Sequence, residues 1–453
     1  MIYMSRQTRE MDMINGKLAP NILKFALPLA ATGILQQLFN AADVAVIGQF
    51  SGKEAMAAVG SNSSVIGLMV NLFTGIALGA NVVIGHATGQ GDGEKVSKTV
   101  HTSIVLAVLG GILMTIIGEI AAGPVVVAMG VPVEVRAMSL LYLRIYLCGM
   151  AFIFLYNFEA AIFRSQGNTQ LPMVILTIAG VINVILNLVF VIGLHMNVAG
   201  VALATVISNV FSSLVLFIML CRNNGNIKVN ISKLRIDRQV MNKVLKIGVP
   251  SGVQGMVFSL ANIVIQSAIN SLGAIIMASS SAAFNLEIIA YYVLNSYSQA
   301  CTTFVSQNFG AGQLDRCKQV LKRCILLSWI STLAVAGLIM VNGETLLGLF
   351  NSDPGVIEAG VIRLKIIFIA YNFTLLQEAF SGYLRGFGMS FIPALVAVIG
   401  ICGTRLLWVF TVFQQYPTYN VLMTVYPVSL GVTALIILVV TVIVKPSRKR
   451  NIL

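Results

Sequence analysis

The chemistry of this chain begins with one acid, Asp43, which lies inside the first long apolar stretch of the sequence. Asn40 and Gln36 precede Asp43 by one and two helical turns, so a helix would carry all three side chains on one face. An ionisable group at membrane depth is costly, and it usually faces a partner or a water-filled cavity. The alternative is a carboxylate near a helix end that reaches water. We predict that Asp43 is a functional acid.

Further polar side chains inside apolar stretches could complete a site around Asp43. Asn183 and Asn187 are one helical turn apart, and their amides could accept from a protonated acid or coordinate a small cation. Ordinary hydrogen bonding between membrane helices would explain both amides equally well. Thr205 stands among small residues that also suit close helix packing.

The second half of the chain carries its own charged residues at membrane depth, Glu287, Glu378 and Arg405. Glu287 and Arg405 have opposite signs and comparable depths, which would suit a structural ion pair. They could also form a second coupling or substrate site, and the sequence leaves both interpretations open. The second half has Ile265 near the position that answers Asp43, so the two halves have specialised.

A set of polar, apolar and aromatic side chains would suit the wall of a cavity for organic compounds. The same helical spacing is typical of ordinary packing and of lipid contact. The candidates are Gln36, Met69, Phe73, Phe154, Met256, Phe258 and Tyr291.

The composition is that of an integral membrane protein. Of the 453 residues, 57% are hydrophobic and 10% are charged, whereas a soluble domain has about 25% charged residues. Apolar stretches of spanning length predict an all-α fold with twelve transmembrane helices. The predicted spans are about 20–48, 57–84, 97–120, 137–162, 170–194, 197–221, 243–270, 274–300, 318–342, 361–384, 391–413 and 421–444.

The formal net charge of +13 could point to nucleic acid, but its distribution indicates membrane topology instead. Twelve spans place both termini on one side, and most lysines and arginines fall on that side. The other side holds Lys53, Arg136, Arg144, Arg363 and Lys365. We predict a multi-pass protein of the cytoplasmic (inner) membrane with both termini in the cytoplasm. Membrane lipid is its expected partner, with no nucleic acid and no obligate protein partner.

The cysteines and histidines predict neither a disulfide framework nor a metal site. None of the six cysteines forms a CxxC pair, and His86, His101 and His195 are scattered. A membrane-embedded enzyme would need histidines clustered with acids, or a Ser/His/Asp set, at membrane depth. We expect no enzymatic activity and no cofactor beyond a coupling ion, H⁺ or Na⁺.

The strongest organising signal is an internal repeat with an offset of 221 residues. The glycine-rich loop at Gly91 recurs at Gly312, and the loop at Gly167 recurs at Gly388. No strand precedes these glycines, so they turn the chain between helices rather than bind phosphate. Each copy has an even number of spans, which makes parallel repeats as in transporters with a central cavity. We predict an amino-terminal six-helix lobe (1–221), a cytoplasmic linker (222–242) and a carboxy-terminal six-helix lobe (243–453).

The two repeats and several local motifs resemble the multidrug and toxic compound extrusion (MATE) family over almost the whole chain. The resemblance implies two helical bundles around a cavity that opens alternately to each side. It also implies cation-coupled antiport, in which entry of H⁺ or Na⁺ drives export of an organic, often cationic and lipophilic compound. The motifs are Pro28, Asn40-Ala-Ala-Asp43-Val-Ala-Val-Ile-Gly48, Gly89-Gln-Gly91-Asp92 and Leu384-Arg385-Gly386-Phe387-Gly388.

Taken residue by residue, the resemblance implies that Asp43 is the acid of a cation site in the amino-terminal lobe. Asn183 and Thr205 match its polar partners, and Tyr142 fits a tyrosine of the fourth helix. Many members have an aspartate where this chain has Asn187, so coordination of Na⁺ would rest on one carboxylate. We therefore favour H⁺ over Na⁺ and the first lobe over the second.

A rival interpretation is a flippase for lipid-linked oligosaccharides or other lipid precursors, from the same superfamily. Its cavity would handle phosphorylated lipid and should be lined by several basic residues. Only Arg144, Arg405 and Lys365 qualify in this chain. The charge pattern therefore favours the antiporter.

Overall fold

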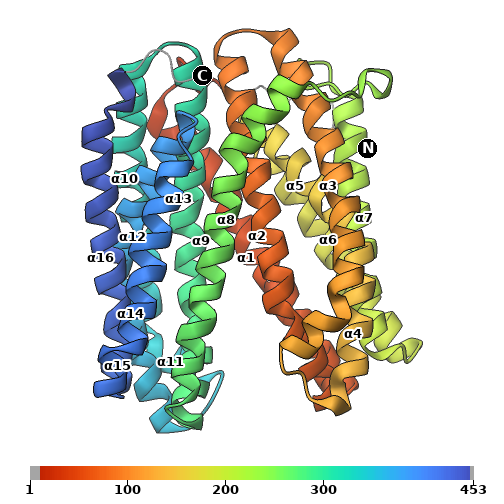
Figure 1. Ribbon diagram of the computed structural model, residues 1–453, viewed down its shortest axis with the longest axis vertical. Helices are drawn as coiled ribbons and strands as arrows, with labels where there is room; N and C mark the ends of the chain where they lie inside the picture. Colours follow the sequence, from red (N-terminus) through yellow and green to blue (C-terminus); the bar gives the residue numbers. More distant parts are fainter. Residues whose placement is uncertain (1–10, 449–453) are drawn as a thin grey trace. The chain divides into compact units, whose positions relative to one another are not determined.

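The computed structural model describes residues 11–448, and the regular structure in that range is entirely helical (Figure 1). The prediction of an all-α fold is confirmed. The first half forms α1 (Leu18–Phe50), α2 (Lys53–Gly89), α3 (Gly93–Ala128), α4 (Val133–Cys148), α5 (Met150–Ser165), α6 (Gln170–Leu188), η1 (Val189–Gly193), α7 (Asn197–Cys221) and η2 (Ile231–Lys233). The second half forms α8 (Arg238–Asn270), α9 (Ala274–Gly310), α10 (Leu314–Val341), α11 (Gly343–Gly348), α12 (Pro354–Gly386), α13 (Phe391–Ala397), η3 (Val398–Gly403), α14 (Thr404–Phe410), α15 (Val412–Gln415), α16 (Tyr419–Val444) and η4 (Pro446–Arg448).

Eleven helical segments of the described chain are long and apolar enough to cross a membrane. The pair α4 and α5 passes the same test as one span that bends by 47°, which gives up to twelve. Large apolar side chains point outward from these helices; on α3, Leu113 is 57% exposed and Ile120 is 76% exposed. Such a surface would be unfavourable in water and is suited to lipid. The predicted multi-pass architecture is confirmed, with a bent pair as its fourth span.

The described chain divides into two compact units. The first holds residues 31–252, and the second holds residues 11–30 and 253–448. Helices α1 and α8 therefore each contribute residues to both units. Helix α8 begins at Arg238, inside the segment 222–242 that we predicted as a linker. The lobe boundaries inferred from the repeat stay a prediction.

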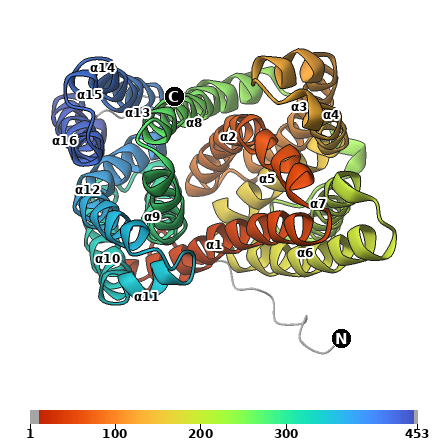
Figure 2. The ribbon, with the colours of Figure 1, turned by 90° about the horizontal axis from the view of Figure 1, so that it is seen from below.

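In the first unit, α5 packs between α2 and α3, and α7 packs against α4, α5 and α6 (Figure 2). A large apolar core includes Ile47 from α1 and the fully buried Leu147 and Phe154 from α4 and α5. Ile47 lies one turn beyond Asp43 on the same helical face. Burial of Ile47 therefore directs Asp43 into the unit as well.

In the second unit, α12 packs against α9, α10 and α16 (Figure 2). Its apolar core includes the buried Leu294 from α9 and the buried Leu364 from α12. Two residues stabilise the start of helix α12. Pro354 occupies its first turn, and the Asp353 carboxylate accepts from the Gly355 amide at 2.8 Å. Proline and an acidic cap both suit a helix start. The helix therefore starts seven residues before the boundary near 361 that hydropathy predicts for the tenth span.

Glycines with a left-handed backbone recur at matching positions of the two repeats. That region is free of strain for glycine, which has no Cβ. The matching loops therefore share their conformation, and the predicted turning role of Gly91 and Gly312 is confirmed. The pairs and their φ angles are Gly52 and Gly273 (88° and 98°), Gly91 and Gly312 (70° and 73°), and Gly167 and Gly388 (85° and 81°).

Two further glycines let α2 approach the first part of α8 within the first unit. A Cβ added at Gly75 would lie 2.2 Å from the amide nitrogen of Gly252. A Cβ at Gly79 would lie 2.3 Å from the carbonyl oxygen of Val244. Both distances are far below van der Waals contact, so the two backbones meet directly, as small residues permit in membrane bundles.

The substitution Gly79→Val should push these helices apart and lower the free energy of unfolding by about 2 kcal/mol, the usual cost of overpacking. Gly60→Ala in the same helix is the control, because nothing lies within 4 Å of a Cβ at that position. Alanine also favours a helix over glycine, so this variant should be at least as stable as the wild type. Thermal unfolding of the purified proteins in detergent measures both effects. Equal melting temperatures for the two variants would contradict the close approach.

Candidate functional site

Asp43 lies in a hydrogen-bonded cluster formed by α1, α6 and α7 of the first unit. The side-chain amide of Asn187 donates to Asp43 Oδ1 at 2.5 Å and to Asn183 Oδ1 at 3.2 Å. The Thr205 hydroxyl lies 3.2 Å from Asp43 Oδ2 and accepts from the Asn183 amide at 3.3 Å. The structure therefore brings together four of the predicted site residues. We call these four residues the Asp43 cluster.

The elements of the cluster are placed by simple helix geometry. Asn183 and Asn187 stack on one face of α6 because they are one turn apart. Asp43 is only 7% exposed, and it forms no salt bridge with any residue of the described range. A buried carboxyl whose partners are amides and a hydroxyl has hydrogen bonds but no counter-charge. Such a group is set up to take a proton or a cation.

Three other residues predicted for this site lie around the cluster rather than in it. Asn40 and Gln36 are exposed on α1, while Tyr142 on α4 is buried with its ring 6.2 Å from that of Tyr146. Among the described residues none of the three forms a hydrogen bond with Asp43. Their roles in coupling stay predictions.

The acid Glu287 of the second unit is already paired. Arg363 on α12 donates to both of its carboxylate oxygens, from Nε at 2.9 Å and from Nη2 at 2.6 Å. Both side chains are buried, and Nη1 of Arg363 donates to the Ser280 hydroxyl at 2.6 Å. The pair of Glu287 with Arg405 that the sequence allowed is not the one that forms. The predicted placement of Arg363 on the side of the membrane opposite the termini stays a prediction, and the structure adds that this arginine is buried in an ion pair.

The acid Glu378 of α12 is paired as well. Nη1 of Arg385 lies 3.7 Å from Glu378 Oε2, and the Ser298 hydroxyl on α9 lies 3.0 Å from the same oxygen. Nη2 of Arg385 donates to the Gln254 side chain at 2.9 Å. Arg385, which the sequence offered only as part of a family motif, therefore neutralises a buried acid.

Two buried charged groups outside the Asp43 cluster, one basic and one acidic, have no ion-pair partner among the described residues. Arg405 on α14 is 2% exposed and donates from Nη1 to Asn262 Oδ1 at 2.7 Å. Glu159 on α5 is fully buried; the Ser213 hydroxyl donates to its Oε2 at 3.3 Å, while Oε1 has no partner. In the sequence, Glu159 is one of the polar groups inside the predicted spans, but we did not assign it to a site. Its lack of an opposite charge at helical spacing is the signal that could have led to that assignment.

The residues predicted to line a substrate cavity divide by burial. Phe73 and Phe154 stack on each other inside the core of the first unit, with an interplanar angle of 19°. The others retain some exposure and stay candidates for contact with a substrate. These are Gln36, Met69, Met256, Phe258 and Tyr291.

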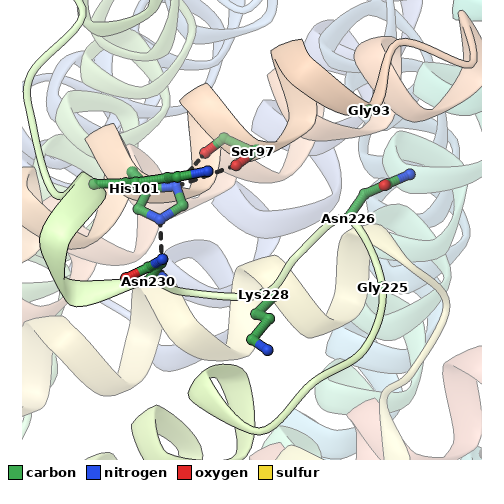
Figure 3. A pocket seen from close by; sticks show the side chains of 8 residues that line it. Gly93, Ser97, His101, Gly225, Asn226, Lys228 and Asn230 are labelled. Carbon is green, nitrogen blue, oxygen red and sulfur yellow. Dashed lines mark hydrogen bonds between the residues drawn. The ribbon is translucent and has the colours of Figure 1, made fainter.

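A pocket of about 330 Å³ lies between the start of α3 and the segment that follows α7 (Figure 3). His101 uses both ring nitrogens there: Nδ1 lies 2.7 Å from the Ser97 carbonyl oxygen, and Nε2 accepts from the Asn230 amide at 3.0 Å. This pattern fits a neutral imidazole with its proton on Nδ1. Lys228 and Lys233 also line the pocket. His101 therefore links the segment after α7 to α3 by hydrogen bonds. The residues that line this pocket do not belong to the Asp43 cluster.

Comparison with known proteins identifies the family. The sequence profile of the MatE family matches residues 28–189 and again residues 250–411, which together make up most of the chain. The chain belongs to the MatE family. The two matches have the same length, so the duplication predicted from the loops is confirmed. As a MatE protein with eleven to twelve apolar spans, the chain is a multi-pass membrane transporter.

Several curated MatE proteins are similar to this chain along most of its length. The probable multidrug resistance protein NorM of Thermotoga maritima is 26% identical, over 87% of this chain and 86% of its own. The probable multidrug resistance protein YoeA of Bacillus subtilis is 27% identical, over 91% of each chain. The multidrug export protein MepA of Staphylococcus aureus is 21% identical, over 83% of this chain and 84% of its own.

Solved structures share the MatE fold with this chain. A crystal structure of MATE in complex with MaL6 superposes with a TM-score of 0.90 at 20% identity, over 97% of this chain and 99% of that one. A MOP superfamily transporter from Pyrococcus furiosus superposes with a TM-score of 0.89 at 20% identity, over 98% of this chain and 99% of its own. The latter is described as having a binding pocket of reverse polarity. These likenesses confirm the fold.

A second carboxylate beside Asp43 should turn the cluster into a sodium site. In the variant Asn187→Asp two acidic groups would face each other, and a monovalent cation between them would relieve their repulsion. We expect Na⁺ to raise the melting temperature of this variant by several degrees relative to K⁺ at equal ionic strength, and to leave the wild type unchanged. An equal response of both proteins would show that Asp43 with neutral partners already binds Na⁺.

Proposed function

We propose that this MatE transporter exports organic, cationic and lipophilic compounds in exchange for H⁺, as a multidrug efflux antiporter. The relatives named as multidrug resistance or export proteins support the substrate class. The coupling is supported by one observation: Asp43 is a buried carboxyl whose hydrogen-bond partners are an amide and a hydroxyl.

Neutralisation of charge favours the first unit as the coupling site. A charge inside a membrane must be compensated. Glu287 and Glu378 receive their compensation from Arg363 and Arg385, so neither needs an exchangeable ion. Asp43 has no such partner among the described residues, and its positive counterpart must come from outside the protein.

The hydrogen bonding of the Thr205 hydroxyl supports a proton as the positive counterpart of Asp43. This hydroxyl accepts from Asn183 and lies within hydrogen-bond distance of two acceptors, Asp43 Oδ2 at 3.2 Å and the Val201 carbonyl at 3.0 Å. A hydroxyl has a single hydrogen to donate, so one of these two contacts lacks a hydrogen while Asp43 is ionised. If Asp43 is protonated on Oδ2, the acid donates to Thr205 and Thr205 donates to Val201. Every contact is then satisfied.

Export would follow from competition at this acid. With Asp43 ionised, the transporter carries a negative charge that attracts a cationic substrate. Protonation from the outside removes that charge and releases the substrate outward. A ligand shifts a conformational equilibrium only by its differential affinity for the two states. The solvation of Asp43 must therefore differ between the inward-open and outward-open forms.

The structure lends less support to a lipid-precursor flippase. Among the basic residues that this alternative would use, Arg144 lies 3.6 Å from Glu119 in a partly exposed ion pair, and Lys365 is exposed. Arg405 alone is both buried and free of an acidic partner among the described residues. One such arginine is a poor lining for a phosphorylated lipid.

The distribution of lysine and arginine supports the cytoplasmic membrane as the location, with both termini in the cytoplasm. Protease protection of tags at each terminus, in intact cells and in inside-out vesicles, would test this orientation. Cleavage should occur at both ends in inside-out vesicles and at neither end in intact cells.

The substitution Asp43→Asn should abolish proton-driven export while leaving expression and membrane insertion normal, because the amide keeps the shape of the acid and cannot take up a proton. Efflux of a fluorescent cation from proteoliposomes, driven in turn by a proton gradient and by a Na⁺ gradient, measures the effect. The variant is expected to fall to the level of protein-free vesicles under the proton gradient.

The matched control is Glu159→Gln, which neutralises a second buried acid in the same unit. Glu159 has one hydroxyl partner and no base, so a neutral side chain suits its surroundings. This variant should export like the wild type. Wild-type export by Asp43→Asn, or export driven by Na⁺ that survives in Asp43→Asn, would place the coupling site elsewhere.

A further inference from the structure

We infer that Arg405 forms an anion-binding subsite in the second unit, which receives a carboxylate or similar group of the transported compound. This inference rests on the proposed function, and it narrows the substrate class to compounds that join an anionic group to a cation. Five observations on the second unit carry it.

The first observation is how the Arg405 guanidinium is held. It lies 4.6 Å from the centre of the Tyr426 ring and 5.2 Å from that of Phe258. Its Nη1 donates to Asn262 Oδ1 at 2.7 Å. Two aromatic faces and one amide fix the plane of the group, but they do not neutralise its charge.

The second observation is the unused edge of the guanidinium. Nε of Arg405 is buried and has no hydrogen-bond partner. Nη2 of Arg405 donates to no residue of the described range. Nε and Nη2 point to the same side of the planar group. Two parallel N–H donors are the arrangement that a carboxylate accepts in a bidentate pair.

The third observation is the local charge. Within the part of the chain that the structure describes, Glu287 is the acid that acts electrostatically on Arg405, and both of its carboxylate oxygens accept from Arg363. Arg363 also lies 5.7 Å from the centre of the Tyr426 ring, so one tyrosine contacts two guanidinium groups. Glu287 and Arg363 cancel each other, and Arg405 remains as an uncompensated positive charge. A buried charge of this kind calls for an anion.

The fourth observation is the place of Arg405 in the repeat. The starts of the two MatE matches, residues 28 and 250, pair Arg405 with Asn183, and the loop offset of 221 pairs it with the neighbouring Val184. By the same count Ile265 replaces Asp43. Asn262, which binds Arg405, likewise takes the place of Asn40. The second unit thus has an apolar residue in place of Asp43, and it carries a base on the helical stretch that answers α6 in the repeat.

The fifth observation is access. The three side chains that contact the Arg405 guanidinium, those of Asn262, Phe258 and Tyr426, are each partly exposed. The π-helical segment η3 directly precedes the helix that carries Arg405. Such segments break the regular helix and are frequent at functional sites. A small anionic group can therefore reach the guanidinium by displacing an aromatic ring.

The test compares two dyes that differ in one group: a rhodamine with a free carboxylate, and the methyl ester of the same rhodamine. Fluorescence polarisation with the purified protein gives a dissociation constant for each. The wild type should bind the acid more tightly than the ester. Arg405→Gln should weaken binding of the acid by about tenfold or more, as expected for a charge-assisted hydrogen bond, and change binding of the ester by less than about twofold.

Two further variants separate recognition from folding. Arg405→Lys keeps the charge without the planar fork and should fall between the wild type and Arg405→Gln. Arg144→Gln removes an exposed arginine and should change neither dye. If Arg405→Gln does not yield folded protein, the ratio of acid to ester binding in Arg405→Lys decides.

Equal binding of acid and ester by the wild type would overturn the inference. So would a loss of both dyes to the same extent in an arginine variant, because Arg405 would then support the bundle rather than recognise an anion. Failure of the wild type to bind or export the ester would instead count against the proposed export of cations. The two failures are therefore distinguishable.

Discussion

The hydrogen bonds that Asp43 receives from Asn187 and Thr205 are the compensation that the described structure offers to a buried carboxyl. In water this would be a minor matter, but inside a bilayer a charge without compensation is expensive. Three helices must meet at one point to supply these bonds. The burial of Ile47 in the apolar core of the first unit, the stacking of the two asparagines on α6 and the position of Thr205 on α7 all contribute to this meeting.

The same constraint explains why the two halves differ. In the second unit, the buried acids Glu287 and Glu378 each form an ion pair with an arginine. A third arginine, Arg405, has no acidic partner among the described residues. In the first unit two buried acids, Asp43 and Glu159, have no arginine or lysine partner among the described residues. Duplication produced two bundles of similar shape, with loops that keep the same left-handed glycines. Substitutions at a few inward-facing positions then gave them opposite unpaired charges, which supports a division of labour between a cation site and an anion site.

The helices make two kinds of contact, close backbone packing and looser packing of aromatic side chains. Direct backbone contact at Gly75 and Gly79 holds α2 against α8 in the first unit, because no side chain lies between them. The aromatic rings around Arg405 are different, since they are partly exposed and hold the guanidinium through its faces. A transporter needs both kinds of contact: fixed ones to carry a bundle as a body, and weak ones where a ligand enters.

The sequence by itself determined the class of the protein, the number of spans, the duplication and the acid at the centre of the first unit. Hydropathy, loop motifs and helical spacing are local properties, and the prediction of Asp43 with Asn183 and Asn187 followed from them. The partners of the other charges were decided by the tertiary structure. The sequence marked Arg363, which pairs with Glu287, only as a basic residue of the side opposite the termini, and it offered Arg405 as a partner of Glu287. Which charges neutralise each other depends on how helices far apart in the chain rotate and cross, and neither rotation nor crossing is written in the spacing of residues along one helix.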